Sequence, residues 1–255
     1  MVRQAHHERT TTHGNPTTYP FVLSVSKGER WIATQSQRGE GKVVLLPWWR
    51  GKRSEEPKVL ERAVFLDRDG TINEEVGYIT HLEQVRLLPG AAAGIRRLNE
   101  SGLKVVVITN QAGVARGVHL ESFIHEVNGL ITAQLRQEGA SIDRIYYCPH
   151  HPLGEVDSYR RECLCRKPAP GLLLQAAGDL ELDLSRSYMV GDRLSDVQMM
   201  QSIGGKGILV LTGHGAEEKE VLQSLDVRPD HVAVDLREAV GWILQQCGDG
   251  ARDDG

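Results

Sequence analysis

The sequence predicts an α/β fold in which a doubly wound parallel sheet is covered by helices on both faces. After residue 62, apolar runs of strand length alternate with helical patterns, and acidic or amide side chains follow several of these runs. Of the 255 residues, 40% are hydrophobic and 27 are glycine, as in an ordinary globular chain. This composition excludes a fully disordered chain, a collagen and a coiled coil, and no apolar run reaches the roughly 18 residues of a membrane span.

The elements of the first half follow in order. Residues 63–66 are a continuous apolar run, as a strand buried on both faces requires. The pattern then predicts a helix over 91–99 and a β-branched strand over 104–108. Apolar residues spaced by three and four predict an amphipathic helix over 119–137, and a third strand is expected over 142–147.

A long irregular segment rich in Cys, His and Pro separates the two halves. The second half predicts a helix from Pro170, a strand over 187–190, a helix over 195–203, a strand over 207–211 and a closing helix over 239–246. This alternation is typical of a Rossmann-like parallel sheet, in which ligands bind beyond the carboxyl ends of the strands.

Residues 1–62 do not join this pattern, although strands are plausible on composition at 21–25 and 42–47. They carry eleven Lys and Arg against six Asp and Glu, in a chain whose net charge is −4. The basic residues are scattered, which favours a solvated extension over a nucleic-acid-binding arm. The alternatives of a disordered segment, a small appendage and an upstream-extended reading frame stay open. We therefore expect a basic extension of unknown structure, a catalytic domain over 63–247 and a flexible tail over 248–255.

The first chemistry-bearing segment is the run Asp67-Arg68-Asp69-Gly70-Thr71 directly after the strand at 63–66. Gly70 lets the backbone turn sharply, which returns Asp69 to the side of Asp67. Paired carboxylates suit a hard cation such as Mg²⁺, and one of them can attack phosphorus. A calcium loop is the alternative, but its glycine stands at position 6, whereas Gly70 stands at position 4.

Two further segments offer groups for an anion. Thr109, Asn110 and Gln111 end the strand at 104–108, and together with the following backbone N–H groups they form a neutral donor set for phosphoryl oxygens. Arg166 and Lys167 precede the helix at Pro170 and could hold a phosphoryl group as its charge develops. Alone, the first is common turn chemistry and the second is a common surface pair.

The strand at 187–190 ends in Gly191-Asp192, with a second acid at Asp196. Asp192 offers another carboxylate to the cation, because the ends of parallel strands meet at one edge of the sheet. Asp196 could join it, or could act only as an acid at a helix N-terminus.

Three thiols and an imidazole gather in the irregular segment as two closely spaced pairs, Cys148 with His150 and Cys163 with Cys165. Four such ligands can close a tetrahedral, structural Zn²⁺ site. The alternatives are unliganded thiols or His151 as a ligand, whereas a Cys163–Cys165 disulfide would be strained. Four cysteines in a chain of this length do not make a disulfide scaffold, which favours a reducing, cytoplasmic location.

Taken together, these segments resemble the haloacid dehalogenase (HAD) superfamily of phosphatases over about residues 63–247. The resemblance implies that Asp67 is the nucleophile and Asp69 the general acid/base, and that Thr109 and Lys167 stabilise the phosphoryl group. It also implies that Asp67, the backbone carbonyl of Asp69 and Asp192 bind catalytic Mg²⁺.

The Cys/His loop resembles the zinc-bearing branch of the superfamily that contains heptose-bisphosphate and histidinol phosphatases. The 12 residues between His150 and Cys163 are closer to the heptose-bisphosphate form. Glu75 stands where many relatives carry Asp, and Arg166 matches the position that recognises the second phosphate or the anomer. The substrate contacts that the resemblance implies are Glu75, Val76, Gly77, Tyr78, Thr109, Asn110, Gln111, Ala112, Arg166 and Lys167.

The sequence therefore predicts a monomeric, Mg²⁺-dependent phosphomonoesterase with structural Zn²⁺ and no membrane partner. By the resemblance, its substrate is a heptose 1,7-bisphosphate that loses its C7 phosphate in nucleotide-heptose and lipopolysaccharide-core precursor synthesis. The alternatives are histidinol phosphate or another small phosphorylated metabolite, a nucleic-acid-end phosphatase that uses the basic extension, and a zinc-stapled interaction module without catalysis.

Overall fold

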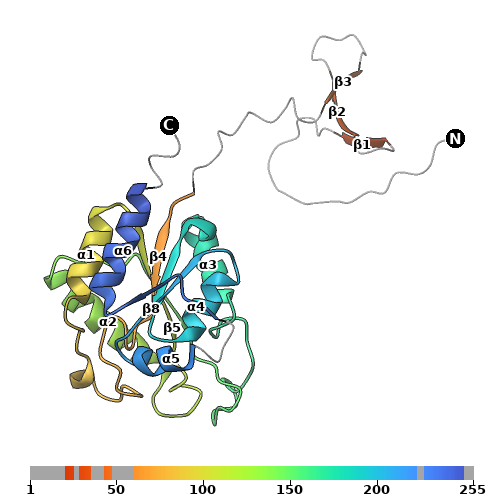
Figure 1. The fold of residues 1–255 in the computed structure, drawn as a ribbon. Coiled ribbons are helices and arrows are strands. Elements are labelled where there is room, and N and C mark those ends of the chain that lie inside the picture. The colour runs from red at the N-terminus through yellow and green to blue at the C-terminus, as the bar shows by residue number, and fades with distance from the viewer. Residues whose placement is uncertain (1–20, 26–28, 36–42, 48–59, 223–226, 250–255) are drawn as a thin grey trace. The chain divides into compact units, whose positions relative to one another are not determined.

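The computed structural model describes residues 21–25, 29–35, 43–47, 60–222 and 227–249 (Figure 1). By its internal contacts the chain divides into two units, residues 1–59 and 60–255. Of the predicted flexible tail over 248–255, residues 248 and 249 belong to the last helix, and 250–255 lie outside the described residues.

The described part of the first unit is a three-stranded antiparallel sheet in the order β1-β2-β3. Strand β1 (Phe21–Val25) pairs with β2 (Glu29–Gln35), and β2 pairs with β3 (Val43–Pro47). The sequence predicts β1 and β3 but not β2, whose charged, apolar and polar residues show no strict alternation. The rest of the predicted extension lies outside the described residues.

The second unit is built on a six-stranded sheet in the order β6-β5-β4-β7-β8-β9, in which every pair of neighbours is parallel. This architecture confirms the predicted α/β class. The order reverses direction at β4, which lies between β5 and β7 and is the first strand of the sheet in the chain. The strands are β4 (Ala63–Leu66), β5 (Lys104–Asn110), β6 (Arg144–Cys148), β7 (Tyr188–Gly191), β8 (Lys206–Val210) and β9 (His231–Ala233).

Helices cover both faces of this sheet (Figure 1). One apolar cluster joins the sheet to residues of α1, α2 and α6, and a second joins the opposite face to α3 and α4. The helices are α1 (Ala91–Glu100), α2 (Glu121–Gln137), α3 (Gly171–Leu180), α4 (Leu194–Gln201), α5 (Gly215–Val221) and α6 (Leu236–Asp249), with short 3₁₀ turns η2 (Leu82–Gln84) and η3 (Leu184–Arg186).

The alternation of side chains along β4 explains its continuous apolar run. Val64 and Leu66 belong to the cluster on one face, whereas Ala63 and Phe65 belong to the cluster on the other. All four are fully buried, so a polar residue on either face would be desolvated without a partner. The first polar side chain that the strand can present is therefore Asp67, beyond its carboxyl end.

Two elements of this unit are absent from the sequence-based prediction, α5 and β9. Strand β9 has only three residues and lies at the edge of the sheet, and α5 has seven. Elements this short carry less than two periods of their pattern, so hydrophobic spacing cannot identify them. Among the described residues, none of the helices has the length and apolar character to cross a membrane.

Candidate active site

The strand order brings three chemistry-bearing strand ends to one point. Asp67 follows β4, Thr109 and Asn110 end β5, and Asp192 follows β7. Because β4 lies between β5 and β7, these side chains surround a single pocket of about 590 Å³ beyond the carboxyl edge of the sheet.

Lys167 joins the acidic side chains in the floor of this pocket. Its Nζ lies 2.8 Å from Asp67 Oδ2 and 2.7 Å from Asp196 Oδ1. It also donates to the carbonyl oxygen of Ile108 at 3.2 Å. The loop that carries Lys167 is joined to the end of β5 through Asn110, whose Oδ1 accepts from the Lys167 backbone N–H at 3.1 Å.

Charge is unbalanced in this cluster. Asp67, Asp192 and Asp196 each offer a carboxylate oxygen, and these oxygens lie within 4.8 Å of one another. All three side chains are buried, and the ammonium of Lys167 forms ion pairs with two of them, Asp67 and Asp196. Buried carboxylates in excess over their cations are costly unless protons or a metal ion balance them. The cluster therefore fits a hard divalent cation.

The pKa values of the cluster reflect the same excess of negative charge. Burial, followed by the charge of Asp67, raises the pKa of Asp192 to about 6. Burial acts to lower the pKa of Lys167, but the carboxylates of Asp196 and Asp67 outweigh it and raise that pKa above its usual value. Lys167 is therefore a permanent cation that a phosphoryl group can meet.

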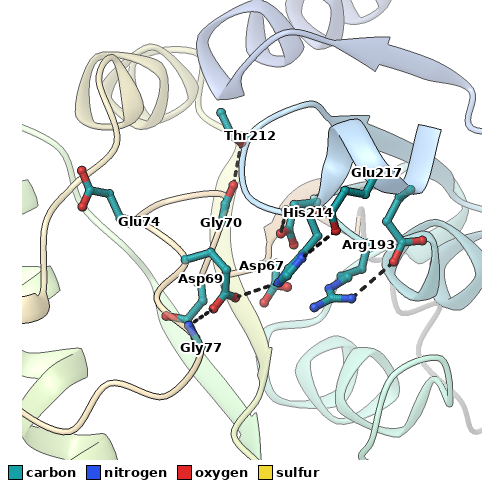
Figure 2. A network of polar contacts seen from close by, with 12 residues as sticks. Asp67, Asp69, Gly70, Glu74, Gly77, Arg193, Thr212, His214 and Glu217 are labelled. Carbon is teal, nitrogen blue, oxygen red and sulfur yellow. Dashed lines mark hydrogen bonds and ion pairs between the residues drawn. The ribbon is translucent and has the colours of Figure 1, made fainter. Parts of the chain in front are cut away.

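Two glycines allow the chain to close around Asp192. Gly70 and Gly213 have φ values of +77° and +54°, in the left-handed region that favours glycine. A Cβ atom at either position would lie 2.2 Å from Asp192 Oδ2, so Asp192 would have to move. Thr212 joins these two turns, since its Oγ1 donates to the Gly70 carbonyl at 2.6 Å (Figure 2).

Asp69 is held by donors on all sides. Its Oδ1 accepts from Arg68 Nε at 3.1 Å and Asn73 Nδ2 at 2.8 Å, and its Oδ2 accepts from Arg68 Nη2 at 2.8 Å and Gln111 Nε2 at 2.8 Å. Burial would raise the pKa of Asp69, but Arg68 and these hydrogen bonds lower it below its usual value. Gln111 also donates to Thr109 Oγ1 at 2.9 Å, which joins Asp69 to the end of β5.

Residues 73–78, hereafter the flap, form one wall of the pocket. Within it, Glu75 Oε1 accepts from the Gly77 backbone N–H at 2.5 Å. Glu75 Oε2 lies 3.9 Å from Nε2 of His214, in the turn after β8, and Figure 2 shows the His214 ring between the flap and Glu217. The backbone N–H of His214 donates to Asp192 Oδ2 at 2.8 Å. His214 thus contacts both the flap and the acidic cluster.

A second group of candidate metal ligands lies at the end of β6 and in the long loop between β6 and α3. Ligand atoms of Cys148, His150, Cys163 and Cys165 lie within 4.8 Å of one another, so the group could hold a metal ion. Sulfur–sulfur distances of 3.1 to 3.5 Å and the 3.2 Å from His150 Nδ1 to Cys165 Sγ are consistent with four ligands around one centre. All the cysteines are free thiols.

This loop is also attached to the N-terminus of α2. The Glu121 carboxylate accepts from the Tyr159 hydroxyl at 2.6 Å and from the Tyr147 hydroxyl at 3.0 Å. At the other end of the loop, Arg166 Nη1 donates to the His150 carbonyl oxygen at 3.3 Å. Arg166, which lines the pocket, is thus joined by a hydrogen bond to the segment that carries His150 of the Cys/His group.

The structure brings nearly all the sequence-predicted site residues together. The catalytic and anion-contact candidates at 67, 69, 109–112, 166, 167 and 192 line the pocket, as do Glu75, Gly77 and Tyr78 of the flap. Val76 does not line it and is 40% exposed. Sequence reasoning missed several lining residues. Some stand beside motif residues without a role that the pattern indicates, and others lie outside any motif, His214 and Glu218 among them just before and within the overlooked helix α5. The missed residues are Arg68, Ile79, His119, Arg193, Ser195, His214 and Glu218.

A family model and the sequences of curated proteins both indicate that the chain is similar to HAD-like hydrolases. Residues 164–239 match the model of the HAD-hydrolase-like family. The D-glycero-D-manno-heptose-1,7-bisphosphate 7-phosphatase of Thermosynechococcus vestitus is 43% identical over 188 residues, which are 71% of this chain and 94% of that protein. The D-glycero-beta-D-manno-heptose-1,7-bisphosphate 7-phosphatase of Escherichia coli K12 is 43% identical over 189 residues, 73% of this chain and 90% of that protein.

Solved structures are similar over the same part of the chain. D,D-heptose 1,7-bisphosphate phosphatase from B. bronchiseptica, complexed with magnesium and phosphate, matches with a TM-score of 0.65 and 31% identity, over 72% of this chain and 99% of that one. A HAD-like phosphatase from Mesorhizobium loti matches with a TM-score of 0.63 and 35% identity, over 73% of this chain and 85% of that one.

Proposed function

Since the chain belongs to the HAD-like hydrolases, in the family of the heptose-1,7-bisphosphate 7-phosphatases, we propose that it removes the C7 phosphate of D-glycero-D-manno-heptose 1,7-bisphosphate. The observation that supports this proposal best is the pocket in which Asp67, Asp69 and Lys167 meet. A buried carboxylate nucleophile beside a fixed cation and a second carboxyl group is the set that phosphoryl transfer through an aspartyl-phosphate needs.

In the first step, a carboxylate oxygen of Asp67 attacks phosphorus in line with the sugar oxygen. The bond from Asp67 to phosphorus forms and the bond from phosphorus to the C7 oxygen breaks. Asp69, which its donors hold ionised in the substrate-free pocket, has to bind a proton before this step and gives it to the leaving oxygen. Lys167, 2.8 Å from Asp67 Oδ2, and the hydroxyl of Thr109 hold the phosphoryl oxygens as their charge develops.

In the second step, water regenerates the enzyme. The Asp69 carboxylate takes a proton from a water molecule, whose oxygen attacks the phosphorus of the aspartyl-phosphate, and Asp67 leaves as a carboxylate. Hydrogen bonds from Arg68, Asn73 and Gln111 to Asp69 stabilise the ionised form that acts as the base in this step.

We assign Mg²⁺ to the acidic cluster, held by Asp67, Asp192 and the backbone carbonyl of Asp69, because the excess of buried carboxylates over cations fits a divalent ion. When bound, it neutralises charge on the transferring phosphoryl group. Asp196, which pairs with Lys167 at 2.7 Å, orients the lysine. We assign Zn²⁺ to Cys148, His150, Cys163 and Cys165, where four protein ligands would leave no position for substrate.

The pocket also has groups for the rest of a bisphosphorylated sugar. Arg166 lies on the Cys/His loop, next to Lys167 in the chain, and its guanidinium suits the second phosphate. Flap residues Glu75, Gly77 and Tyr78 and the 110–112 turn face the same space and suit sugar hydroxyls. We propose that residues 63–247 form the phosphatase domain.

A substrate panel tests the proposal directly. The full chain with Mg²⁺ is offered heptose 1,7-bisphosphate, histidinol phosphate and a 5′-phosphorylated oligonucleotide, and released phosphate is measured. We expect the heptose bisphosphate to give the highest kcat/KM by at least about 10²-fold, because only it fills both anion positions. A higher value for histidinol phosphate or for the oligonucleotide would overturn the assignment.

A further inference from the structure

One buried side chain in the pocket enters the proposed chemistry only through its hydrogen bonds to Asp69. Arg68 follows the nucleophile directly, and it is only 3% exposed although it carries a permanent charge. A buried guanidinium is expensive unless its donors are paired, so the partners of Arg68 show what it does.

The partners of Arg68 point to one carboxylate. Two of its nitrogens face Asp69, with Nε 3.1 Å from Oδ1 and Nη2 2.8 Å from Oδ2. A two-point fork of this kind fixes the plane of a carboxylate as well as its position, which a single contact cannot do. The plane matters because a carboxyl group transfers a proton along a defined lone-pair direction.

The third contact of Arg68 comes from outside the pocket. Its Nη1 donates to Oδ1 of Asn128 at 3.0 Å, and Asn128 is 8% exposed on α2. Asn128 is not among the residues that line the pocket. Hydrogen bonds from Arg68 to Asn128 and to Asp69 therefore connect helix α2, which covers one face of the sheet, to the carboxyl group proposed as the general acid/base.

We propose that Arg68 and Asn128 are positioning residues, which hold the Asp69 carboxyl group in the orientation required for proton transfer to the leaving oxygen. This inference rests on the proposed function, since it assigns how one step of that chemistry is oriented. Arg68 acts through Asp69 rather than on the substrate, and Asn128 acts through Arg68.

The dependence on the leaving group distinguishes positioning from a general structural role. The phenolate of p-nitrophenyl phosphate leaves without needing a proton, whereas that of phenyl phosphate needs one. Because kcat/KM reports the steps up to departure of the leaving group, misorientation of Asp69 lowers this constant for phenyl phosphate and spares p-nitrophenyl phosphate. Damage to the fold, or to the nucleophile beside Arg68, lowers both.

The experiment measures kcat/KM for both aryl phosphates in four variants. For Arg68→Lys, which keeps the charge and loses the fork, we expect a loss of about 10- to 100-fold on phenyl phosphate and less than about threefold on p-nitrophenyl phosphate. Asn128→Ala should show the same selective loss at about 3- to 10-fold, and Asn128→Asp, which keeps an acceptor for Nη1, should restore the ratio. Thr132→Val is the matched control, since its hydroxyl donates to the Asn128 backbone at 2.8 Å and does not contact Arg68.

Equal losses on both aryl phosphates, or no loss on either, would overturn the inference. If Arg68→Lys does not fold, Asn128→Ala carries the test, because its side chain is outside the pocket. The heptose bisphosphate is measured in parallel on the unmodified chain. Hydrolysis of the aryl phosphates without hydrolysis of the sugar would contradict the proposed substrate and leave this inference in place.

Discussion

The two groups of candidate metal ligands differ in how the chain positions them. The carboxylates at 67, 192 and 196 follow the central strands or begin the helix after one, and they are almost completely buried. In the Cys/His group, Cys148 ends β6, whereas His150, Cys163 and Cys165 lie in the loop without regular elements between β6 and α3 and are partly exposed. The sheet builds the first group by itself, whereas the second needs its own ligands to hold the loop together. The sheet thus positions the carboxylates, whereas the loop positions Arg166 and Lys167.

The largest expected effect is at the nucleophile. Asp67→Asn replaces a carboxylate oxygen by an amide nitrogen that cannot form the aspartyl-phosphate, so we expect kcat to fall by more than about 10⁴-fold. The same change removes one of three crowded negative charges, so the thermal midpoint should stay the same or rise. Released phosphate and thermal unfolding measure the two effects. Retained activity would exclude Asp67 as the nucleophile, and a large drop in the midpoint would show that the carboxylate serves the fold.

The second largest effect is expected when Lys167, the cation paired with Asp67 and Asp196, is replaced. Lys167→Met leaves the buried carboxylates of Asp67 and Asp196 without their ion-pair partner, so we expect the free energy of unfolding to fall by about 3–5 kcal/mol. The value of kcat should fall by about 10²- to 10³-fold. Added Mg²⁺ should recover part of the stability but not the activity. Arg193→Ala is the control for stability, since its pair with Glu218 is half exposed and should be worth less than about 1 kcal/mol. An equal loss of stability in the two variants would contradict this account.

The loop should respond to metal in a different way. Chelation followed by return of Mg²⁺ alone should leave activity about tenfold below its starting value, because the loop that presents Arg166 and Lys167 stays loose. Return of Mg²⁺ with Zn²⁺ should restore it fully. Cys163→Ser should behave like the Mg²⁺-only sample whatever metal is added. Full recovery with Mg²⁺ alone would show that the Cys/His group does not order this part of the pocket.

The same contrast explains what could be predicted from the sequence. The strands that carry Asp67, Thr109 and Asp192 are β-branched or apolar runs, and parallel strands necessarily bring their carboxyl ends to one edge. The fold class and the meeting of these residues therefore follow from local pattern and topology. The roles of these residues in catalysis remain proposals.

What the sequence missed depends on long-range contact. His214 follows β8 and reaches the flap more than 130 residues earlier in the chain, and no spacing pattern encodes that pair. Arg68 stands inside a recognised motif, but the contact that indicates its role is with Asn128, 60 residues away in the sequence. In the sequence, Asn128 is only one polar position on an amphipathic helix. Polar networks of this kind are set by tertiary packing, to which single-sequence periodicity is blind.

The smallest predicted effect concerns the contact between the loop after β8 and the flap. Glu75 lies 3.9 Å from the His214 ring, which is 32% exposed, so the pair should be worth about 0.2–1 kcal/mol. His214→Ala keeps the backbone N–H that holds Asp192, and we expect KM to rise by about two- to fivefold with little change in kcat. Glu217→Gln is the control, because that carboxylate is 83% exposed on the other side of the ring.

A double-variant cycle separates this contact from independent effects of its two members. If His214 acts by holding the flap through Glu75, the KM of the double variant His214→Ala with Glu75→Ala should match that of Glu75→Ala alone. Fully additive increases in KM would mean that each side chain meets the substrate separately. A fall in kcat as large as the rise in KM would instead mean that His214 acts on the carboxylates at the strand ends through Asp192, and not on the flap.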